Sequence, residues 1–191
     1  MPQAKNITIY TIGHSNHPAE HFIELLKEHK IELVIDVRSS PHSRYCPQFN
    51  KNALAQTLQL AGIEYKFLGS ELGGRPDDSA LFTDNKVDFA LLAQQPAFLA
   101  AIEDVIKLSA EKKVALMCSE KDPLKCHRTI LISRHLKNED VNVLHILSDA
   151  SLISQADIEQ SLIELHKLND MYNSRDDILN LAYDLQTKRI S

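Results

Sequence analysis

Five short runs with the pattern of strands alternate with amphipathic segments along the first 150 residues, and this alternation constrains the fold more than any other feature. The runs occupy residues 7–12, 33–37, 63–68, 113–117 and 141–147. Each has the length of a strand, and residues 33–37 are apolar almost throughout, which is typical of a strand buried on both faces. Strands that alternate with helices form a parallel sheet, because each parallel connection must cross over a face of the sheet.

The length of the chain selects among parallel-sheet folds. A (β/α)8 barrel takes about 250 residues, whereas this chain has 191. We therefore predict an α/β fold with an open, mostly parallel, Rossmann-like sheet and helices on both faces. Helical patterns are expected after Pro18, from Asn50 to Gly62, from Pro96 and over 130–137. Residues 77–86 are expected to be irregular and residues 87–95 to form a short helix.

The pattern divides the chain into an α/β domain, residues 1–150, and a C-terminal extension, residues 151–191. The extension carries helical patterns over residues 156–168 and 177–188. Apolar residues repeat at helical spacing in the first of these, which is too regular for a disordered tail. We expect the extension to pack as helices on the domain, or on a second copy of the chain in a homodimer.

The composition of the chain indicates its cellular compartment and excludes some classes of partner. The chain has three cysteines, an odd and small number that argues against a disulfide framework and for a reducing compartment. No apolar run approaches the roughly 20 residues of a membrane helix, and residues 1–6 are too polar for a secretory signal. We predict a cytoplasmic protein with no membrane partner. Residues 149–191 hold eight acids and four bases, and the remainder is nearly neutral, so no general basic surface is expected.

Polar and reactive side chains gather directly after the predicted strands. Parallel strands bring their carboxyl ends to one edge of the sheet, where ligands of open α/β folds bind. The candidates for substrate binding are Ser15, Asp36, Arg38, Ser43, Arg44, Tyr45, Gly73, Gly74, Arg75, Glu120 and Arg128. The arginines among them favour a substrate that carries phosphate or carboxylate, which guanidinium groups bind bidentately. Arg38 and Arg128 can instead pair with Asp36, Glu120 or Asp122 in a structural network.

The fourth strand leads into the most reactive stretch of the sequence. Cys118 closes this strand, and Asp122 and Pro123 are typical of the start of the next helix. Cys126 would then lie at a helix N-terminus beside His127. We expect it to be partly exposed there, so that its thiol has a lowered pKa. Neither cysteine has an arginine six residues on, so the Cys-x5-Arg loop of phosphatases and sulfurtransferases is absent.

Several separated motifs resemble the domain-of-unknown-function 488 family. They are Thr11-Ile12-Gly13-His14-Ser15, Asp36-Val37-Arg38 with Pro41 and Ser43-Arg44, Leu72-Gly73-Gly74-Arg75, Met117-Cys118-Ser119-Glu120 and Cys126-His127-Arg128. They stand in the family's order, and the resemblance covers residues 7 to about 148. It implies a cytosolic bacterial or archaeal α/β protein, without supplying a reaction.

These observations lead to three functional hypotheses. The first is an enzyme, a hydrolase or transferase, that acts on a small anionic molecule such as a nucleotide. His14 or His127 would be its acid or base, and Cys118 or Cys126 its nucleophile or a polar wall of its site. The second is a non-catalytic module for a nucleic acid or a small ligand. The third is a metal site at Cys118, Cys126 and His127, which the spacing disfavours because structural zinc ligands come as close pairs; no cofactor is expected.

Overall fold

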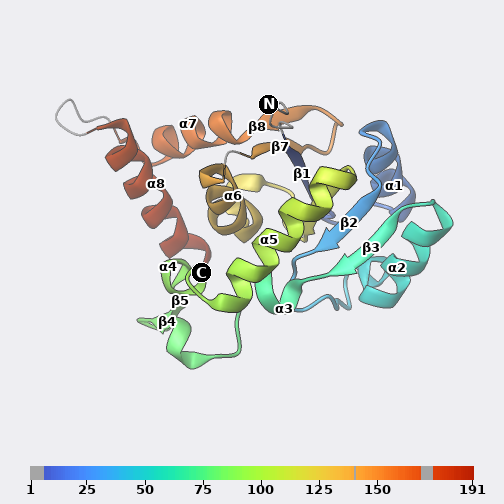
Figure 1. The fold of residues 1–191 in the computed structure, drawn as a ribbon, viewed down its shortest axis with the longest axis horizontal. Helices are drawn as coiled ribbons and strands as arrows, with labels where there is room; N and C mark the ends of the chain where they lie inside the picture. The colour runs from blue at the N-terminus through green and yellow to red at the C-terminus, as the bar shows by residue number, and fades with distance from the viewer. Residues whose placement is uncertain (1–6, 140, 169–173) are drawn as a thin grey trace, which may run out of the picture.

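The computed structural model describes residues 7–139, 141–168 and 174–191 (Figure 1). Its main sheet has six strands in the order β3-β2-β6-β1-β7-β8. The strands are β1 (Thr8–Gly13), β2 (Leu33–Asp36), β3 (Glu64–Phe67), β6 (Val114–Cys118), β7 (Asn142–Ile146) and β8 (Leu152–Ser154). All neighbours are parallel except β7 and β8, which pair antiparallel. The predicted open and mostly parallel sheet is confirmed.

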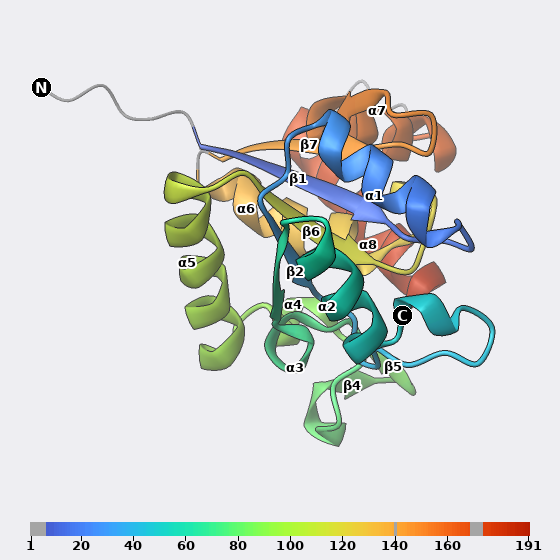
Figure 2. The same ribbon diagram turned by 90° about the vertical axis from the view of Figure 1, so that its right-hand side faces the viewer.

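Helices cover both faces of this sheet (Figure 2). On one face lie α1 (Ala19–Glu28) and α2 (Lys51–Leu60), whose Phe22, Leu26 and Leu58 pack against Val34 and Met117 of the sheet. The other face carries α3 (Gly69–Leu72), α4 (Phe89–Leu92), α5 (Pro96–Glu111), α6 (Arg134–Asn138), α7 (Gln155–Leu165) and α8 (Arg175–Ile190). Alternate residues of each buried strand therefore enter two separate cores.

Residues 77–86, expected to be irregular, contain regular structure. They form a 3-10 turn, Ser79–Leu81, and the strand β4 (Phe82–Thr83), which pairs antiparallel with β5 (Lys86–Val87). The turn between these strands has left-handed backbone at Asp84 and Asn85, with φ of 52° and 60°. This conformation suits a two-residue hairpin turn, and the two residue types tolerate it well.

The turn after β6 also departs from expectation. The predicted capping residue Asp122 accepts a hydrogen bond from the backbone N–H of Leu124, but only a 3-10 turn, Pro123–Lys125, follows it. The chain is extended at Cys126, and a π-helical turn then runs from Arg128 to Ser133 before α6. Cys126 therefore lies between two helical segments rather than in the first turn of one.

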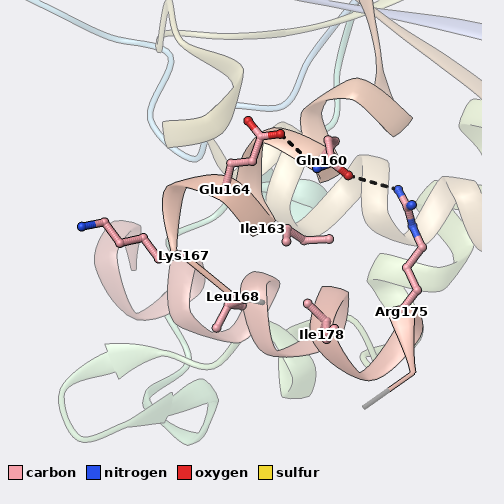
Figure 3. A pocket seen from close by; sticks show the side chains of 7 residues that line it. All are labelled: Gln160, Ile163, Glu164, Lys167, Leu168, Arg175 and Ile178. Carbon is pink, nitrogen blue, oxygen red and sulfur yellow. Dashed lines mark hydrogen bonds between the residues drawn. The ribbon is translucent and has the colours of Figure 1, made fainter. Parts of the chain in front are cut away.

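The C-terminal extension consists of β8, α7 and α8. Helix α7 begins with a capping box between Ser154 and Asp157 and packs on β7 and β8, and α8 packs on α7 and on residues 123–133. A groove of about 680 Å3 lies between α7 and α8, with Ile163 and Ile178 among its apolar residues (Figure 3). No helix among the described residues is long and apolar enough to cross a membrane.

Candidate functional site

A cavity of about 400 Å3 opens at the carboxyl ends of β2 and β6, where the sequence predicted a ligand site. We call it the cleft. Its lining comprises Arg38, Ser39, Ser40, Gly74, Arg75, Asp77, Phe89, Cys118, Ser119, Glu120, Lys125, His127 and Ile190. The residues that follow β2 face those that follow β6 because these two strands are neighbours in the sheet. Topology thus brings together segments about 80 residues apart.

Two glycines permit the close packing that shapes this edge. A Cβ at Gly13 would lie 1.9 Å from the carbonyl oxygen of Glu120, and one at Gly74 would lie 2.7 Å from the ring of His127. Contacts this short are forbidden for any residue with a side chain. Gly13 therefore lets the turn after β6 cross over β1, and Gly74 holds the imidazole of His127 against its own backbone.

Cys118 and His127 form a polar pair in the cleft. The sulfur of Cys118 lies 3.6 Å from Nδ1 of His127. The other ring nitrogen, Nε2, lies 3.0 Å from the carbonyl oxygen of Val37 and can only donate to it. This bond fixes the ring orientation and turns Nδ1 toward the sulfur. The arrangement is the one that activates a thiol nucleophile, with a base beside it that a third group orients.

Electrostatics strengthens the pair. The pKa of the Cys118 thiol lies well below its usual value, first because Cys126 donates a hydrogen bond to its sulfur and then because His127 is adjacent, and these effects outweigh burial. Burial alone would lower the pKa of His127, but the adjacent Cys118 thiolate and the bond to Val37 raise it above 6.5. Opposite shifts in two touching groups favour a thiolate–imidazolium pair at neutral pH.

Cys126 does not behave as predicted. We expected it to be partly exposed and to carry a lowered pKa, but it is only 1% exposed. Burial raises the pKa of its thiol well above the usual value, and its hydrogen bond to Cys118 acts in the same direction. A helical segment does begin here, since the Cys126 carbonyl accepts from the backbone N–H groups of Thr129 and Ile130. The backbone of Arg128 lowers the pKa of the thiol, but burial outweighs this effect. Cys126 is a neutral thiol that supports the thiolate of Cys118.

The surroundings of His14 do not suit the predicted role of a general acid or base. Its Nδ1 donates to the carbonyl oxygen of Ser15 at 2.7 Å, and its Nε2 accepts from Arg38 at 3.0 Å. The ring stacks on Phe49 with centroids 4.3 Å apart. Burial lowers the pKa of His14 to about 4, and the neighbouring Arg38 adds to this effect. Both ring nitrogens are occupied in the neutral form, so His14 positions Arg38 and does not line the cleft.

The two most buried arginines of the candidate set bind groups within the protein. Arg38 holds the carboxylate of Asp36 bidentately, at 2.9 and 2.7 Å, and also donates to the carbonyl oxygen of Phe49. Arg128 is fully buried and donates to the carbonyl oxygen of Glu120 at 2.6 Å. Arg38 still lines the cleft, whereas Arg128 is not part of the lining. The structural network that the sequence left open is therefore present around Asp36 and Arg38.

Other candidates take different places around the cleft. Glu120 and Arg75 are exposed and line it, whereas Gly73 packs against Ser39 beneath it. The structure does not bring Ser15, Ser43, Arg44 or Tyr45 into its lining. Arg44 and Tyr45 are exposed on the loop after β2, and the hydroxyl of Ser43 accepts hydrogen bonds from the backbone of that loop. Besides Arg38, the cations that line the cleft are Arg75, which the sequence predicted, and Lys125, which it did not, whereas the predicted Arg44 and Arg128 are not part of the lining.

Sequence reasoning missed seven residues of the lining. They are Ser39, Ser40, Asp77, Phe89, Ser119, Lys125 and Ile190. Three of them, Ser39, Ser40 and Ser119, follow a predicted strand within a few residues, so their position after β2 or β6 was a usable signal. Phe89 and Ile190 carry no such signal, because they come from α4 and from the end of α8.

A comparison with protein families identifies the family of this chain. A family model described as "Domain of unknown function DUF488" matches residues 18–135. The chain belongs to the DUF488 family. The matched segment of this DUF488 protein contains Cys118, Cys126 and His127, and it ends before β7, so the C-terminal extension lies outside it. No curated protein and no solved structure matches the chain significantly.

Proposed function

We propose that this protein is a thiol-dependent enzyme, a hydrolase or transferase, with Cys118 as its nucleophile. The observation that carries the proposal is the 3.6 Å contact between Cys118 Sγ and His127 Nδ1, together with the opposite pKa shifts of the two groups. A thiolate is the reactive form of cysteine, and a paired imidazolium keeps it populated at neutral pH. All three cysteines are free thiols, which fits a reducing, cytoplasmic setting for such chemistry.

The reaction that this pair supports is nucleophilic substitution at an electrophilic carbon or phosphorus. The sulfur of Cys118 forms a bond to that atom, and the bond to the leaving group breaks with its electron pair. His127 then gives its Nδ1 proton to the leaving group, which departs neutral. Attack by water or by a second substrate on the covalent intermediate releases Cys118 and restores the proton to His127.

The charges around the cleft suit a small anionic substrate. Arg38, Arg75 and Lys125 oppose Asp77 and Glu120 in the lining. The carboxylate of Asp36 offsets the charge of Arg38 from behind, at 2.7 Å. With Asp36 counted, three cationic side chains oppose three anionic ones, and this balance favours a substrate with one carboxylate or one phosphate monoester over a polyphosphate. A nucleoside monophosphate belongs to this class.

A panel of carboxylates and phosphate monoesters tests the proposal. Purified protein is incubated with the panel, and conversion and protein-bound adducts are followed by mass spectrometry. We expect conversion by the wild type and by Cys46→Ser, and none by Cys118→Ser. Binding without conversion by the wild type would instead favour a non-catalytic binding module. Conversion that survives in Cys118→Ser would refute a cysteine nucleophile.

A metal site is the second candidate, and a specific arrangement favours it. The ligand atoms of Cys118, Cys126 and His127 lie within 4.8 Å of one another, and the bond from His127 to Val37 is of the kind that orients metal-bound histidines. Two sulfurs and one nitrogen suit zinc with an open fourth position. The nearby Arg128 opposes a cation. Equimolar zinc in the purified Cys46→Ser protein, lost in Cys126→Ser, would support this candidate over the free thiolate.

A further inference from the structure

The end of the C-terminal helix forms part of the cleft. Ile190, the last residue of α8, lines it together with Phe89, and most of the remaining lining is polar. Helix α8 lies outside the segment that matches the family, residues 18–135. We infer that α8 completes the active site proposed above and that Ile190 is a specificity-determining residue, which limits the size of the substrate group beside Cys118. This inference rests on the proposed function of the cleft.

One buried side chain ties α8 to the turn that carries the cleft. Gln186 is 2% exposed, and its Nε2 donates to the carbonyl oxygen of Leu124 at 2.6 Å. Its Oε1 lies 3.0 Å from Nε2 of His166, at the end of α7. Leu124 belongs to the 3-10 turn between Cys118 and Cys126. A buried amide that satisfies a backbone carbonyl is costly to displace, so Gln186 holds α8 at a fixed distance from this turn.

A second, longer connection runs through the interior. Tyr183 of α8 accepts a hydrogen bond from Gln155 at 2.7 Å, and Gln155 contacts Nε2 of His145 at 2.8 Å. Nδ1 of His145 lies 2.8 Å from the hydroxyl of Thr11, which also accepts from Arg128 at 3.2 Å. This network of hydrogen bonds ends at Arg128, which binds the backbone beside the cleft.

The hydrogen bonds of this network can all donate in one consistent direction. Burial lowers the pKa of His145 to about 4, so its ring is neutral at pH 7. A neutral imidazole has one donor and one acceptor nitrogen, and Gln155 and Thr11 use one each. Every described polar group of this network therefore has a hydrogen-bond partner, and such networks rigidify the core around them. Ile190 is consequently presented to the cleft by a fixed helix rather than by a loose terminus.

Thiol-reactive probes of different size test the role of Ile190. In a Cys46→Ser background, iodoacetamide is the small probe and N-cyclohexylmaleimide the bulky one, with the labelled residue identified by peptide mapping. Removing the side chain in Ile190→Ala should speed bulky labelling of Cys118 by about tenfold relative to the small probe. Ile190→Trp should slow bulky labelling. Leu181→Ala, on an exposed part of the same helix, should change either rate by less than about twofold.

A second reporter separates the two proposals. Ser119 lines the cleft beside Cys118, so Ser119→Cys in a Cys46→Ser, Cys118→Ser protein reports access without a thiolate at position 118. Equal size selectivity in Ile190→Ala and the parent, at both reporters, would overturn the role of Ile190. A pH profile of Cys118 like that of a free thiol, with size selectivity kept at the Ser119→Cys reporter, would overturn the proposed nucleophile. It would leave the size-limiting role of Ile190 supported.

Discussion

Replacing His127 by glutamine should raise the pH at which Cys118 becomes a thiolate. Glutamine keeps a donor for the carbonyl oxygen of Val37, which His127 contacts at 3.0 Å, but it carries no charge at any pH. The thiolate of Cys118 then loses the positive charge beside it. The hydrogen bond from Cys126 remains, so the change isolates the contribution of the imidazolium.

The structure sets the scale of the effect. Two unit charges 3.6 Å apart interact by about 5 kcal/mol at the effective dielectric constant of about 20 that suits protein sites. Reorganisation and water entry reduce this energy in the variant. Even one third of it lowers the thiolate population at a pH below the thiol pKa by more than about tenfold, since 1.4 kcal/mol corresponds to a factor of about 10.

The assay is the pH profile of alkylation by iodoacetamide from pH 4 to pH 10 in a Cys46→Ser background. The midpoint is used rather than the rate at one pH, because a thiolate of higher pKa is also intrinsically more nucleophilic. We expect the midpoint of Cys118 to rise in His127→Gln and to stay unchanged in His42→Gln, which removes an exposed imidazole. An unchanged midpoint in a folded His127→Gln protein would refute the ion pair.

Burial of polar groups and close backbone contacts give three further predictions for the free energy of unfolding, each measured by urea denaturation. Arg128→Met should lower it by about 3 kcal/mol, because the buried groups that this arginine satisfies lose their partner; a loss under 0.5 kcal/mol would contradict the assigned contacts. Gly13→Ala should cost about 3 kcal/mol or more, because its Cβ would lie 1.9 Å from a backbone oxygen, whereas Gly62→Ala should cost only about 1 kcal/mol for its left-handed backbone. His14 and His145 have pKa values near 4 when folded and about 6.5 when unfolded. The unfolded chain therefore binds more protons between these values, and stability should fall as the pH drops from 6.5 to 4, less steeply in His145→Gln.

Much of the fold could be predicted because its signals are local. The apolar runs at 33–37 and 113–117 are too short for helices and become the central strands β2 and β6. The elements that were missed are the ones with weak local signals. Strand β8 spans only Leu152–Ser154, and the strands of the hairpin have two residues each, so hydrophobic periodicity cannot reveal them.

The site was predictable in position and less so in chemistry. Cys118 and His127 follow the fourth predicted strand, and this placed them at the ligand-binding edge. Both cysteines are buried, so which of them carries the thiolate depends on His127, whose Nδ1 lies 3.6 Å from the sulfur of Cys118. The partners of Arg128 include the backbone carbonyl of Glu120 and the hydroxyl of Thr11, 117 residues away in the sequence, and no local pattern indicates either contact. Ile190 reaches the cleft only through the packing of α8, so nothing near it in the sequence could indicate its role.

The pH at which Cys118 loses its proton decides between a nucleophile and a buried structural thiol. Thiolate absorbance near 240 nm, titrated in Cys46→Ser and corrected with Cys46→Ser, Cys118→Ser, isolates this residue from Cys126. The predicted result is a midpoint well below the free-thiol value of about 8.5, with Cys126 titrating well above it. A midpoint for Cys118 at or above the free-thiol value would contradict the thiolate–imidazolium pair and, with it, the proposed function.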